Sequence, residues 1–268
     1  MQQSSTPCSA CSWTPERQDN YRYQSHVKLF YEMSDRGVWS LGSNLVLKER
    51  SSQAPNFEAA NLQFLKKETT IPVSTVVEDW EEENDECYFL LMRRIPGSPL
   101  SNLWPDLTIS EKENIAQQTA NYLMQLRKLQ SDKLQSLGGK PLYSAFLFQD
   151  EHDVPHGPIS SDDDLWSELE LALEGVPDDA RQRLRDRMPS AAPYTFTHGD
   201  LASVNIMVDD DRDLAGIIDW EASGYFPVWW EFTSAGIGLG QEDKEWKVLL
   251  QKYMPDFSDA RGMALLKG

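Results

Sequence analysis

Two short runs of β-forming residues near the end of the chain enclose an acidic turn, and this segment strongly limits the folds that the chain can adopt. The first run is Ile206 to Val208 and the second is Leu214 to Ile218, with Asp209 to Asp213 between them. This pattern predicts an antiparallel hairpin. Because a hairpin returns to where it began, Asn205 before the first strand and Asp219 after the second are expected at the same end.

Polar residues just upstream add to that end of the hairpin. Asp200 lies five residues before Asn205, and His198 lies two residues before Asp200. Converging oxygen ligands suit Mg²⁺, which proteins hold with few side chains plus the phosphates of a substrate. The spacing His-x-Asp-x-x-x-x-Asn, followed by a hairpin that ends in Asp, is typical of phosphoryl transfer. In that arrangement Asp200 accepts the proton of the attacking hydroxyl, while Asn205 and Asp219 hold the metal ions.

Acidic turns also form without any function, because Asp and Asn favour turns. We accept this interpretation for the turn from Asp209 to Asp213. For the set His198, Asp200, Asn205 and Asp219 it requires four spaced positions and a hairpin to match by accident. Phosphoryl transfer is therefore the better interpretation of the set.

The chain is strongly acidic, with 25 Lys and Arg against 43 Asp and Glu in 268 residues and a formal net charge of −18. Nucleic-acid binding depends on basic side chains that neutralise phosphates, so no nucleic-acid partner is expected. An anionic membrane surface is disfavoured for the same reason. The longest apolar run, Tyr88 to Met92, is far shorter than the ~20 residues of a membrane-spanning helix, and the polar start of the chain is unlike a secretion signal.

The cysteines favour a reducing compartment. The chain has three of them, Cys8, Cys11 and Cys87, and an odd count cannot make a disulfide framework. A cytoplasmic protein is therefore expected. Cys8 and Cys11 form a Cys-x-x-Cys pair, but a zinc site needs about four ligands. We interpret the pair as incidental.

The hydrophobic pattern changes period at Pro96-Gly97, which separates a β-rich part from a helical part. Before this point the pattern predicts strands at His26 to Tyr31, Gly37 to Leu41, Asn44 to Lys48, Val73 to Val77 and Cys87 to Met92. The acidic run from Glu78 to Glu86 is interpreted as a solvated turn.

Helices are predicted where apolar residues recur every three or four positions. The first begins at Asn56 as N-cap and presents Phe57, Ala60, Phe64 and Leu65 on one face. The second spans Ser110 to Leu129, with Ser110 and Glu113 as a capping box. A loop is expected from Gly138 to Pro158, and a third helix from Asp162 to Glu174.

Five segments of the sequence match the pattern of a known family. They are Phe196 to Leu201, Asn205 to Val208, Gly216 to Glu221, Gly224 to Pro227 with Trp230-Glu231, and Leu90 to Gly97. In these segments the chain resembles the aminoglycoside phosphotransferase and choline kinase group of small-molecule kinases, in particular a branch common in fungi.

The resemblance implies an α+β, two-lobed protein-kinase-like fold with ATP in the cleft between the lobes. A small antiparallel sheet with one helix would form the N-lobe, and a larger, mostly helical part would form the C-lobe. We accordingly expect a loose tail over residues 1–24, an N-lobe over 25–95 and a C-lobe over 96–268. In the loop before the hairpin, Asp200 would be the catalytic base and His198 a structural brace, with Asn205 and Asp219 as Mg²⁺ ligands.

A kinase needs a strand lysine that holds the α- and β-phosphates and a helix glutamate that pairs with it. Lys48 and Glu58 occur at suitable positions, with Glu49 and Glu68 as rival partners for the lysine. The resemblance further implies that the segment containing Met92, Arg93 and Arg94 is the hinge, whose backbone binds adenine.

The predicted function is ATP- and Mg²⁺-dependent transfer of the γ-phosphoryl group to a hydroxyl of a small molecule. An amine-bearing alcohol, an aminoglycoside or a secondary metabolite would fit, because acidic groups attract cations and indole faces accept ammonium groups. Trp220, Glu221, Trp230 and Glu231 are the candidate substrate residues. Packing in the helical core is the alternative role for the tryptophans.

A second function class remains open, because the hairpin before Lys48 lacks a glycine-rich loop. A kinase-like protein could bind nucleotide or a small ligand without phosphoryl transfer, or perform another biosynthetic step. A protein kinase is disfavoured, since no Ala-Pro-Glu segment follows Asp219.

Overall fold

The computed structural model describes residues 27–33, 36–52, 56–82, 86–144, 146–148, 154–238 and 240–260. The chain divides into two compact units: unit 1 comprises residues 1–56 and 74–94, and unit 2 comprises residues 57–73 and 95–268. Residues 57–73, which the sequence placed in the N-lobe, thus cluster with unit 2. The Cys8 and Cys11 pair and the expected N-terminal tail lie outside the described residues.

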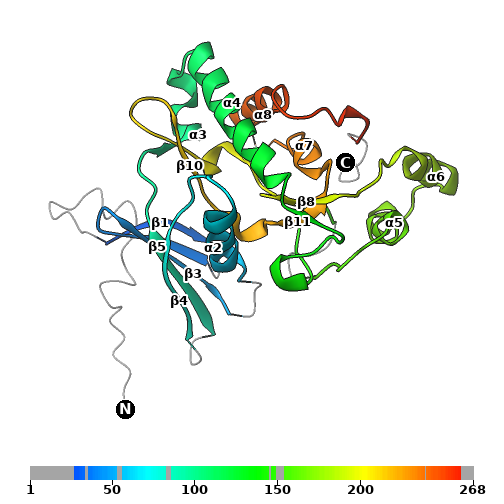
Figure 1. Cartoon of the computed structure of the whole chain (residues 1–268), viewed down its shortest axis with the longest axis horizontal. Helices are drawn as coiled ribbons and strands as arrows, with labels where there is room; N and C mark the ends of the chain where they lie inside the picture. Colours follow the sequence, from blue (N-terminus) through cyan, green and yellow to red (C-terminus); the bar gives the residue numbers. More distant parts are fainter. Residues whose placement is uncertain are drawn as a thin grey trace. The chain divides into compact units, whose positions relative to one another are not determined.

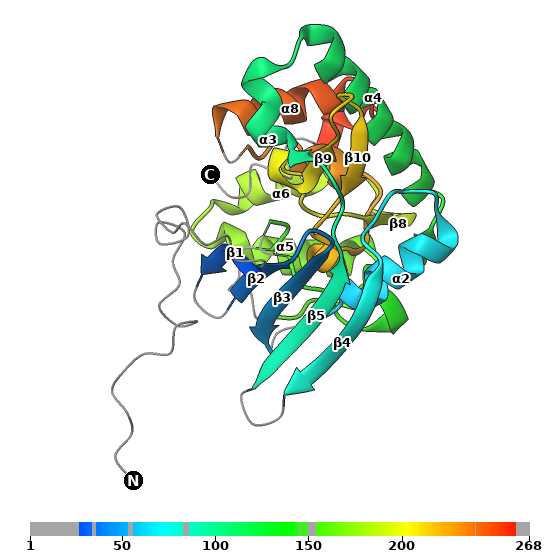
Figure 2. The ribbon, with the colours of Figure 1, turned by 90° about the vertical axis from the view of Figure 1, so that its left-hand side faces the viewer.

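Unit 1 is built on a five-stranded antiparallel sheet with the strand order β1-β2-β3-β5-β4 (Figure 2). Its strands are β1 (Val27–Met33), β2 (Arg36–Leu41), β3 (Leu45–Ser51), β4 (Val76–Glu82) and β5 (Cys87–Arg93). Along β5 every second side chain is buried, as the two-residue period of a strand requires. Four of the five expected strands are confirmed in place, and β4 is displaced.

Strand β4 corrects the interpretation of the acidic run. The sequence predicted a strand at residues 73–77 and a turn after it, whereas β4 begins at Val76 and carries Glu78, Asp79 and Glu81 within the strand. It is an edge strand of the sheet, and these charged side chains are exposed. Charges on an edge strand discourage pairing with other chains. The acidic run is therefore solvated, but largely as a strand rather than as a turn.

Helix α2 (Glu58–Glu68) is the helix of residues 57–73 in unit 2. Its N-cap is Phe57, one residue later than predicted, and has no side-chain cap hydrogen bond. The predicted apolar face is also shifted, because Ala60 is exposed whereas Asn61 is buried. Asn61 is buried because its amide binds the backbone around the short 3₁₀ helix η5 (Trp220–Ala222). The buried face of α2 thus combines this polar contact with the apolar residues Leu62 and Leu65.

Unit 2 is otherwise mostly helical (Figure 1). Its longest helix, α4, packs against α8, as Figures 1 and 2 both show. The α-helices after α2 are α3 (Leu100–Leu103), α4 (Ile109–Leu126), α5 (Asp162–Glu170), α6 (Asp178–Arg187), α7 (Trp230–Ser234) and α8 (Gln241–Gln251). Further 3₁₀ turns are η1 (Trp104–Asp106), η2 (Leu137–Gly139), η3 (Leu171–Leu173), η4 (Ser203–Asn205) and η6 (Ser258–Ala260).

The start of α4 corrects a predicted cap. Thr108 and Glu111 form the capping box, in which the Thr108 side chain accepts from Glu111 N at 3.3 Å and Glu111 accepts from Thr108 N at 2.7 Å. The sequence has the same pattern two residues later, at Ser110 and Glu113, and the local motif alone could not choose between the two registers. The helix predicted over residues 110–129 is confirmed as far as Leu126, and the helix predicted over residues 162–174 is present as α5 followed by η3. Helices α3, α6, α7 and α8 were not predicted.

Two three-stranded sheets in unit 2 hold the ends of one loop. The first has the order β10-β9-β6 and the second has the order β11-β8-β7. Their strands are β6 (Ser98–Pro99), β7 (Gln130–Ser131), β8 (Tyr194–Thr197), β9 (Ile206–Val208), β10 (Leu214–Ile217) and β11 (Gly224–Pro227). Since β8 ends at residue 197 and β9 begins at residue 206, the loop 198–205 is fixed at both ends by sheet pairing.

Among the described residues, no helix is both long enough and apolar enough to cross a membrane.

Candidate active site

The hairpin of β9 and β10 has the predicted geometry. Ile217 pairs with Ile206 across the two antiparallel strands, and Ile218 N donates to the carbonyl oxygen of Asn205 at 3.0 Å. This bond closes the hairpin at the end where Asp219 follows. Asp219 itself has a left-handed backbone, with φ 67° and ψ 59°, a conformation that Asn and Asp tolerate better than most residues.

The loop 198–205 carries Asp200 and orients it through its own backbone. Asp200 N donates to His198 Nδ1 at 3.2 Å, and Asn205 Nδ2 donates to the carbonyl oxygen of Asp200 at 3.0 Å. The amide nitrogen of Asn205 is thereby committed to the loop, so its oxygen is the atom that could bind a cation. The Asp200 side chain is half-buried, which leaves it accessible from outside the loop.

A glycine is required inside this loop. Gly199 has φ +88°, and a Cβ at this position would lie 2.8 Å from the carbonyl oxygen of Ala222. Both the backbone conformation and the close approach exclude an ordinary side chain. The glycine next to Asp200 thus allows the loop to pack directly on η5.

His198 is fully buried beneath the loop. Its Nε2 lies 2.9 Å from the carbonyl oxygen of Ile218, so this nitrogen carries the proton and Nδ1 accepts from Asp200 N. The ring packs on Trp220 with the ring centroids 4.5 Å apart. Burial lowers the pKa of the imidazole, which favours the neutral ring. This geometry supports a positioning role, in which His198 connects the loop to the end of the hairpin.

Glu231, the second residue of α7, holds the start of the loop. Its Oε2 accepts from His198 N at 2.8 Å. Burial is the main cause that raises the pKa of this carboxyl to about 7, while the nearby backbone N–H groups of His198 and Gly199 act in the opposite direction. Among the described residues, the other carboxylate oxygen, Oε1, has no hydrogen-bond partner although it is buried.

Helix α8 holds the middle of the loop. Asp243 accepts from Ser203 N at 2.7 Å, and Trp246 Nε1 donates to the carbonyl oxygen of Leu201 at 3.0 Å. Lys247 pairs with Asp243 at 3.2 Å, and both side chains are almost fully buried. Sequence reasoning missed these three α8 residues. Their spacing was the available signal, because Asp243, Trp246, Lys247 and Leu250 recur every three or four positions and share one buried helix face. Two of the four residues are charged, so the pattern did not resemble an apolar face.

Three carboxylates gather where the hairpin meets α2. Oxygen atoms of Glu58, Asp219 and Glu221 all lie within 4.8 Å of one another. We refer to these three residues as the acidic cluster. Three negative charges at this separation repel one another, and a divalent cation with a preference for oxygen ligands would offset that repulsion. The donor set therefore fits Mg²⁺.

Helix α2 also fixes the backbone between the members of the acidic cluster. Glu58 Oε1 accepts from Trp220 N at 3.3 Å, and Asn61 Nδ2 donates to the carbonyl oxygen of Trp220 at 2.8 Å. The sequence predicted Glu58 as a partner of Lys48 and did not anticipate its place beside Asp219 and Glu221. No local pattern reveals this contact, because Glu58 and Asp219 are far apart in the sequence.

The two candidate substrate tryptophans lie in the core of unit 2. Trp220 and Trp230 have no exposed surface. Trp220 donates through Nε1 to the carbonyl oxygen of Ile217 at 2.8 Å, and Trp230 stacks on Phe226 with the ring centroids 6.3 Å apart. Their buried faces correspond to the packing alternative in the sequence analysis. Glu221 lies in the acidic cluster and Glu231 next to the loop.

Unit 1 carries the residues predicted to bind nucleotide. Lys48 lies on β3 and pairs with Val38 of β2 and Leu90 of β5. Arg93 N donates to the carbonyl oxygen of Thr75 at 2.8 Å, and Arg94 N donates to that of Asn44 at 2.9 Å. The N–H groups of the predicted hinge are therefore used within unit 1. The side chain of Met92 in the same segment is buried.

Comparisons with known proteins agree with this architecture. The model of the family described as "Phosphotransferase enzyme family" matches residues 35–257. No curated protein gives a significant match to the whole sequence.

Solved structures give the fold. The GDP complex of wild-type aminoglycoside 2′-phosphotransferase-IIIa superposes with a TM-score of 0.61 at 16% identity, over 94% of this chain and 84% of that one. The ternary complex of APH(2″)-IIa with streptomycin and ATP gives 0.58 at 16% identity, over 94% and 84%. An aminoglycoside-3′-phosphotransferase of type VIII gives 0.55 at 18% identity, over 94% and 96%. The predicted α+β, protein-kinase-like fold is confirmed.

Proposed function

Because the chain belongs to the phosphotransferase enzyme family, we propose that it transfers the γ-phosphoryl group of ATP to a hydroxyl of a small molecule in the presence of Mg²⁺. The observation that carries the proposal is the closed hairpin end, where Ile218 N binds the carbonyl oxygen of Asn205 and Asn205 binds that of Asp200. These bonds fix the base candidate and the first metal ligand on one short loop, with Asp219 following Ile218 directly.

Asp200 is the proposed general base. Its carboxylate accepts the proton of the acceptor hydroxyl as the hydroxyl oxygen forms a bond to the γ-phosphorus, and the bond from the γ-phosphorus to the bridging oxygen of ADP breaks. Because such transition states are loose, positioning and charge stabilisation contribute most of the rate. The bonds that hold the loop 198–205 supply that positioning.

Asn205 and Asp219 are the proposed Mg²⁺ ligands, and Glu58 and Glu221 of the acidic cluster supply further carboxylate oxygens nearby. The ion would neutralise negative charge on the phosphates of the nucleotide. Without it, the acidic cluster would repel those phosphates. The proposal therefore makes nucleotide binding depend on the cation.

Lys48 is the proposed ligand of the α- and β-phosphates, and the segment with Met92, Arg93 and Arg94 is the proposed adenine site. The N–H groups of Arg93 and Arg94 are already bonded within unit 1, so we assign the adenine contact to carbonyl oxygens of this segment. Structures of the same fold contain ATP, ADP or GDP, which supports a nucleotide as the phosphoryl donor.

The acceptor is proposed to be a small alcohol that carries an amine. The chain has a net charge of −18, and both Glu231 and Asp200 line one pocket beside the loop. Such a site attracts a cation. Proteins of this fold have been solved in complex with streptomycin, gentamicin and kanamycin, which carry both hydroxyl and basic nitrogen groups.

A mass-shift screen tests the function. The purified chain is incubated with ATP, Mg²⁺ and a panel of amino alcohols, aminoglycosides and phenols, and acceptors that gain one phosphoryl group are identified by mass spectrometry. Asp200→Ala should lose at least ~10²-fold in rate, the usual contribution of a general base. Asp210→Ala, in the exposed turn of the hairpin, is the matched control and should keep the wild-type rate.

Binding measurements separate this proposal from a nucleotide-binding protein without transfer. Calorimetry with Mg²⁺ and ATP should show binding in both the wild type and Asp200→Ala. Binding without transfer to any member of the panel would favour the inactive alternative. Full activity of Asp200→Ala would reject the mechanism.

A further inference from the structure

The backbone of Asp219 adopts a conformation that the surrounding structure must hold. Its φ of 67° and ψ of 59° are left-handed, and a residue with a side chain keeps such a conformation only where its neighbours over-determine it. Residues of this kind are common at functional sites. The direction of the Asp219 carboxylate, and so its fitness as a Mg²⁺ ligand, therefore depends on what holds the peptide groups before and after it.

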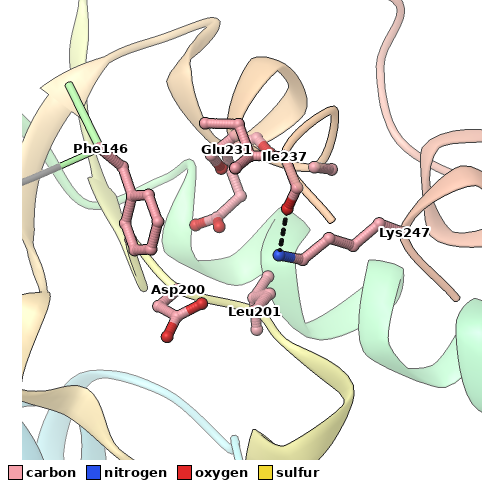
Figure 3. A pocket seen from close by; sticks show the side chains of 9 residues that line it. Phe146, Asp200, Leu201, Glu231, Ile237 and Lys247 are labelled. Carbon is pink, nitrogen blue, oxygen red and sulfur yellow. Dashed lines mark hydrogen bonds between the residues drawn. The ribbon is translucent and has the colours of Figure 1, made fainter. Parts of the chain in front are cut away.

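Asp200 and Asp219 are held from different elements. Figure 3 shows the side chains around Asp200, among them Glu231 from α7. The peptide group before Asp219 is held by His198, whose Nε2 donates to the carbonyl oxygen of Ile218 at 2.9 Å. Because a peptide group is planar, this bond restricts rotation about φ of Asp219.

Helix α2 holds the backbone after Asp219. Glu58 Oε1 accepts from Trp220 N at 3.3 Å, which restricts ψ of Asp219. Asn61, one helical turn after Glu58, donates through Nδ2 to the carbonyl oxygen of Trp220 at 2.8 Å. That carbonyl belongs to the peptide group between Trp220 and Glu221, so Asn61 holds the backbone that joins two members of the acidic cluster.

Asn61 contributes to this contact as a donor. The residue is fully buried, and its Nδ2 also donates to the carbonyl oxygen of Ser223, at the end of η5, at 3.4 Å. Its Oδ1 has no hydrogen-bond partner among the described residues, which is unfavourable for a buried acceptor. The favourable polar contacts of this side chain are therefore those that its N–H groups make with η5.

Other contacts attach α2 and the residues after it to the rest of unit 2. Ile217 N donates to the carbonyl oxygen of Pro72 at 3.0 Å. Gln125 of α4 accepts from Thr70 N at 2.9 Å and donates to Thr70 Oγ1 at 2.9 Å. A variant that lacks only the Asn61 amide should therefore keep α2 in place.

We propose that Asn61 is a positioning residue for the cation site, because it holds the backbone between Asp219 and Glu221 and so fixes the direction of their carboxylates. Asn61 acts through these two ligand candidates and does not bind the ion itself. Residues that orient metal ligands typically contribute ~10–100-fold to metal affinity. This inference rests on the proposed function, which assigns Mg²⁺ to this end of the hairpin.

Cation binding without turnover tests this role. Mn²⁺, which prefers the same oxygen ligands as Mg²⁺, is titrated into the protein, and the free ion is measured by electron paramagnetic resonance. Other carboxylates of this acidic chain can also bind Mn²⁺, so the site is defined as the binding that Asp219→Asn removes. Asn61→Leu has a similar volume but no donor, and its Kd at this site should be ~10–100-fold higher than the wild-type value.

Two controls separate positioning from stability. Gln63→Leu makes the same kind of change on the exposed face of α2 and should leave the Kd for Mn²⁺ unchanged. Gln125→Ala removes the bonds to Thr70 and should lower the melting temperature, but it leaves the contact with η5 in place and should also leave the Kd unchanged. If Gln125→Ala and Asn61→Leu raise the Kd equally, Asn61 acts only by attaching α2, and the inference is overturned.

A second variant covers a failure of Asn61→Leu to fold. Thermal unfolding checks each protein, and Asn61→Ala, which removes the same donor with a smaller side chain, should show the same rise in Kd. An unchanged Kd in a folded Asn61 variant would overturn the inference.

The wild-type titration separates the two proposals. If the wild type binds Mn²⁺ at a site that Asp219→Asn removes, and Asn61→Leu binds it equally tightly, the inference is wrong and the proposed function stands. If the wild type shows no Mn²⁺ binding that depends on Asp219, the cation assignment in the proposed function fails, and the inference fails with it.

Discussion

The loop 198–205 and the acidic cluster, both in unit 2, differ in how their polar groups are arranged. In the loop, backbone groups of His198, Asp200, Leu201 and Ser203 have side-chain partners between 2.7 and 3.2 Å away. In the acidic cluster, three carboxylates come within 4.8 Å of one another. Folding thus stabilises the loop, whereas the cluster gathers like charges.

This difference indicates a separate physical role for the loop and for the acidic cluster. A loop held by side chains of α7 and α8 presents Asp200 in a fixed position before any substrate arrives, and such preorganisation lowers a reaction barrier. Carboxylates at this spacing repel one another, and a bound cation would add to the stability of the folded protein. Functional sites often combine a rigid support with a locally unfavourable group of this kind.

The largest expected effect on the unfolding free energy comes from removing a contact between α8 and the loop 198–205. Asp243→Ala leaves the buried Lys247 without its carboxylate and removes the acceptor of Ser203 N. A buried charge that loses its partner costs ~3–5 kcal/mol of unfolding free energy. Urea denaturation measures this loss. Glu242→Ala, one position earlier on the exposed face of α8, should change the free energy by less than ~0.5 kcal/mol. Equal losses in the two variants would contradict the assigned role.

Trp246→Phe should have a smaller effect on the same support. It keeps the aromatic packing but removes the Nε1–H that binds the carbonyl oxygen of Leu201. An unsatisfied buried acceptor costs ~1–3 kcal/mol. Because the loop then holds Asp200 less firmly, kcat should fall while the KM for ATP changes little. A change in KM alone would argue that Trp246 does not position the loop.

In the acidic cluster, Asp219→Asn should reduce the repulsion between the carboxylates. Asparagine tolerates the left-handed backbone at this position, and the loss of one charge at about 4 Å is worth about 1 kcal/mol. Without Mg²⁺ the variant should therefore melt at a higher temperature than the wild type, and added Mg²⁺ should stabilise it less. Asp210→Asn, in the exposed turn, should show neither change. Wild-type stabilisation by Mg²⁺ in Asp219→Asn would contradict the assignment.

The last expected effect is a pH dependence of stability that comes from Glu231. Burial raises the pKa of its carboxyl to about 7 in the folded protein, from 4.5 for an ordinary glutamate. The folded state therefore binds this proton more tightly than the unfolded state, so its contribution to stability is fully present below pH 4.5 and is lost as the pH rises through about 7. Glu231→Gln should show a weaker decline in unfolding free energy over this window. Parallel pH profiles would contradict the raised pKa.

Features that depend on local sequence could be predicted. The hairpin of β9 and β10 was predicted because strand propensity, the acidic turn and the flanking Asn205 and Asp219 all lie within one short segment. The same holds for β2 and β3. The position of Asp200, five residues before Asn205, placed it on the loop before the hairpin, and this loop runs from β8 to β9.

Features that depend on distant contacts could not be predicted. Asp243 accepts from Ser203 N, which lies 40 residues away in the sequence. Because Asp243 is charged, the sequence pattern did not identify this face of α8 as buried. Asn61 is buried, in place of the apolar residue expected on that face of α2, because the backbone of Trp220, 159 residues away, binds its amide. Glu58 accepts from the backbone N–H of Trp220, which places it beside Asp219 and Glu221. In each case the hydrogen bond joins segments that are far apart in the sequence, so a local pattern could not reveal it.

A single-turnover experiment tests the central claim most directly. Wild-type protein, Asp200→Ala and Asp219→Asn are each mixed with γ-labelled ATP and an accepted alcohol, with and without Mg²⁺, and the label on the alcohol is followed in time. We expect rapid transfer only in the wild type with Mg²⁺, and bound but untransferred nucleotide in Asp200→Ala. Transfer at the wild-type rate by Asp200→Ala, or without Mg²⁺, would contradict this account.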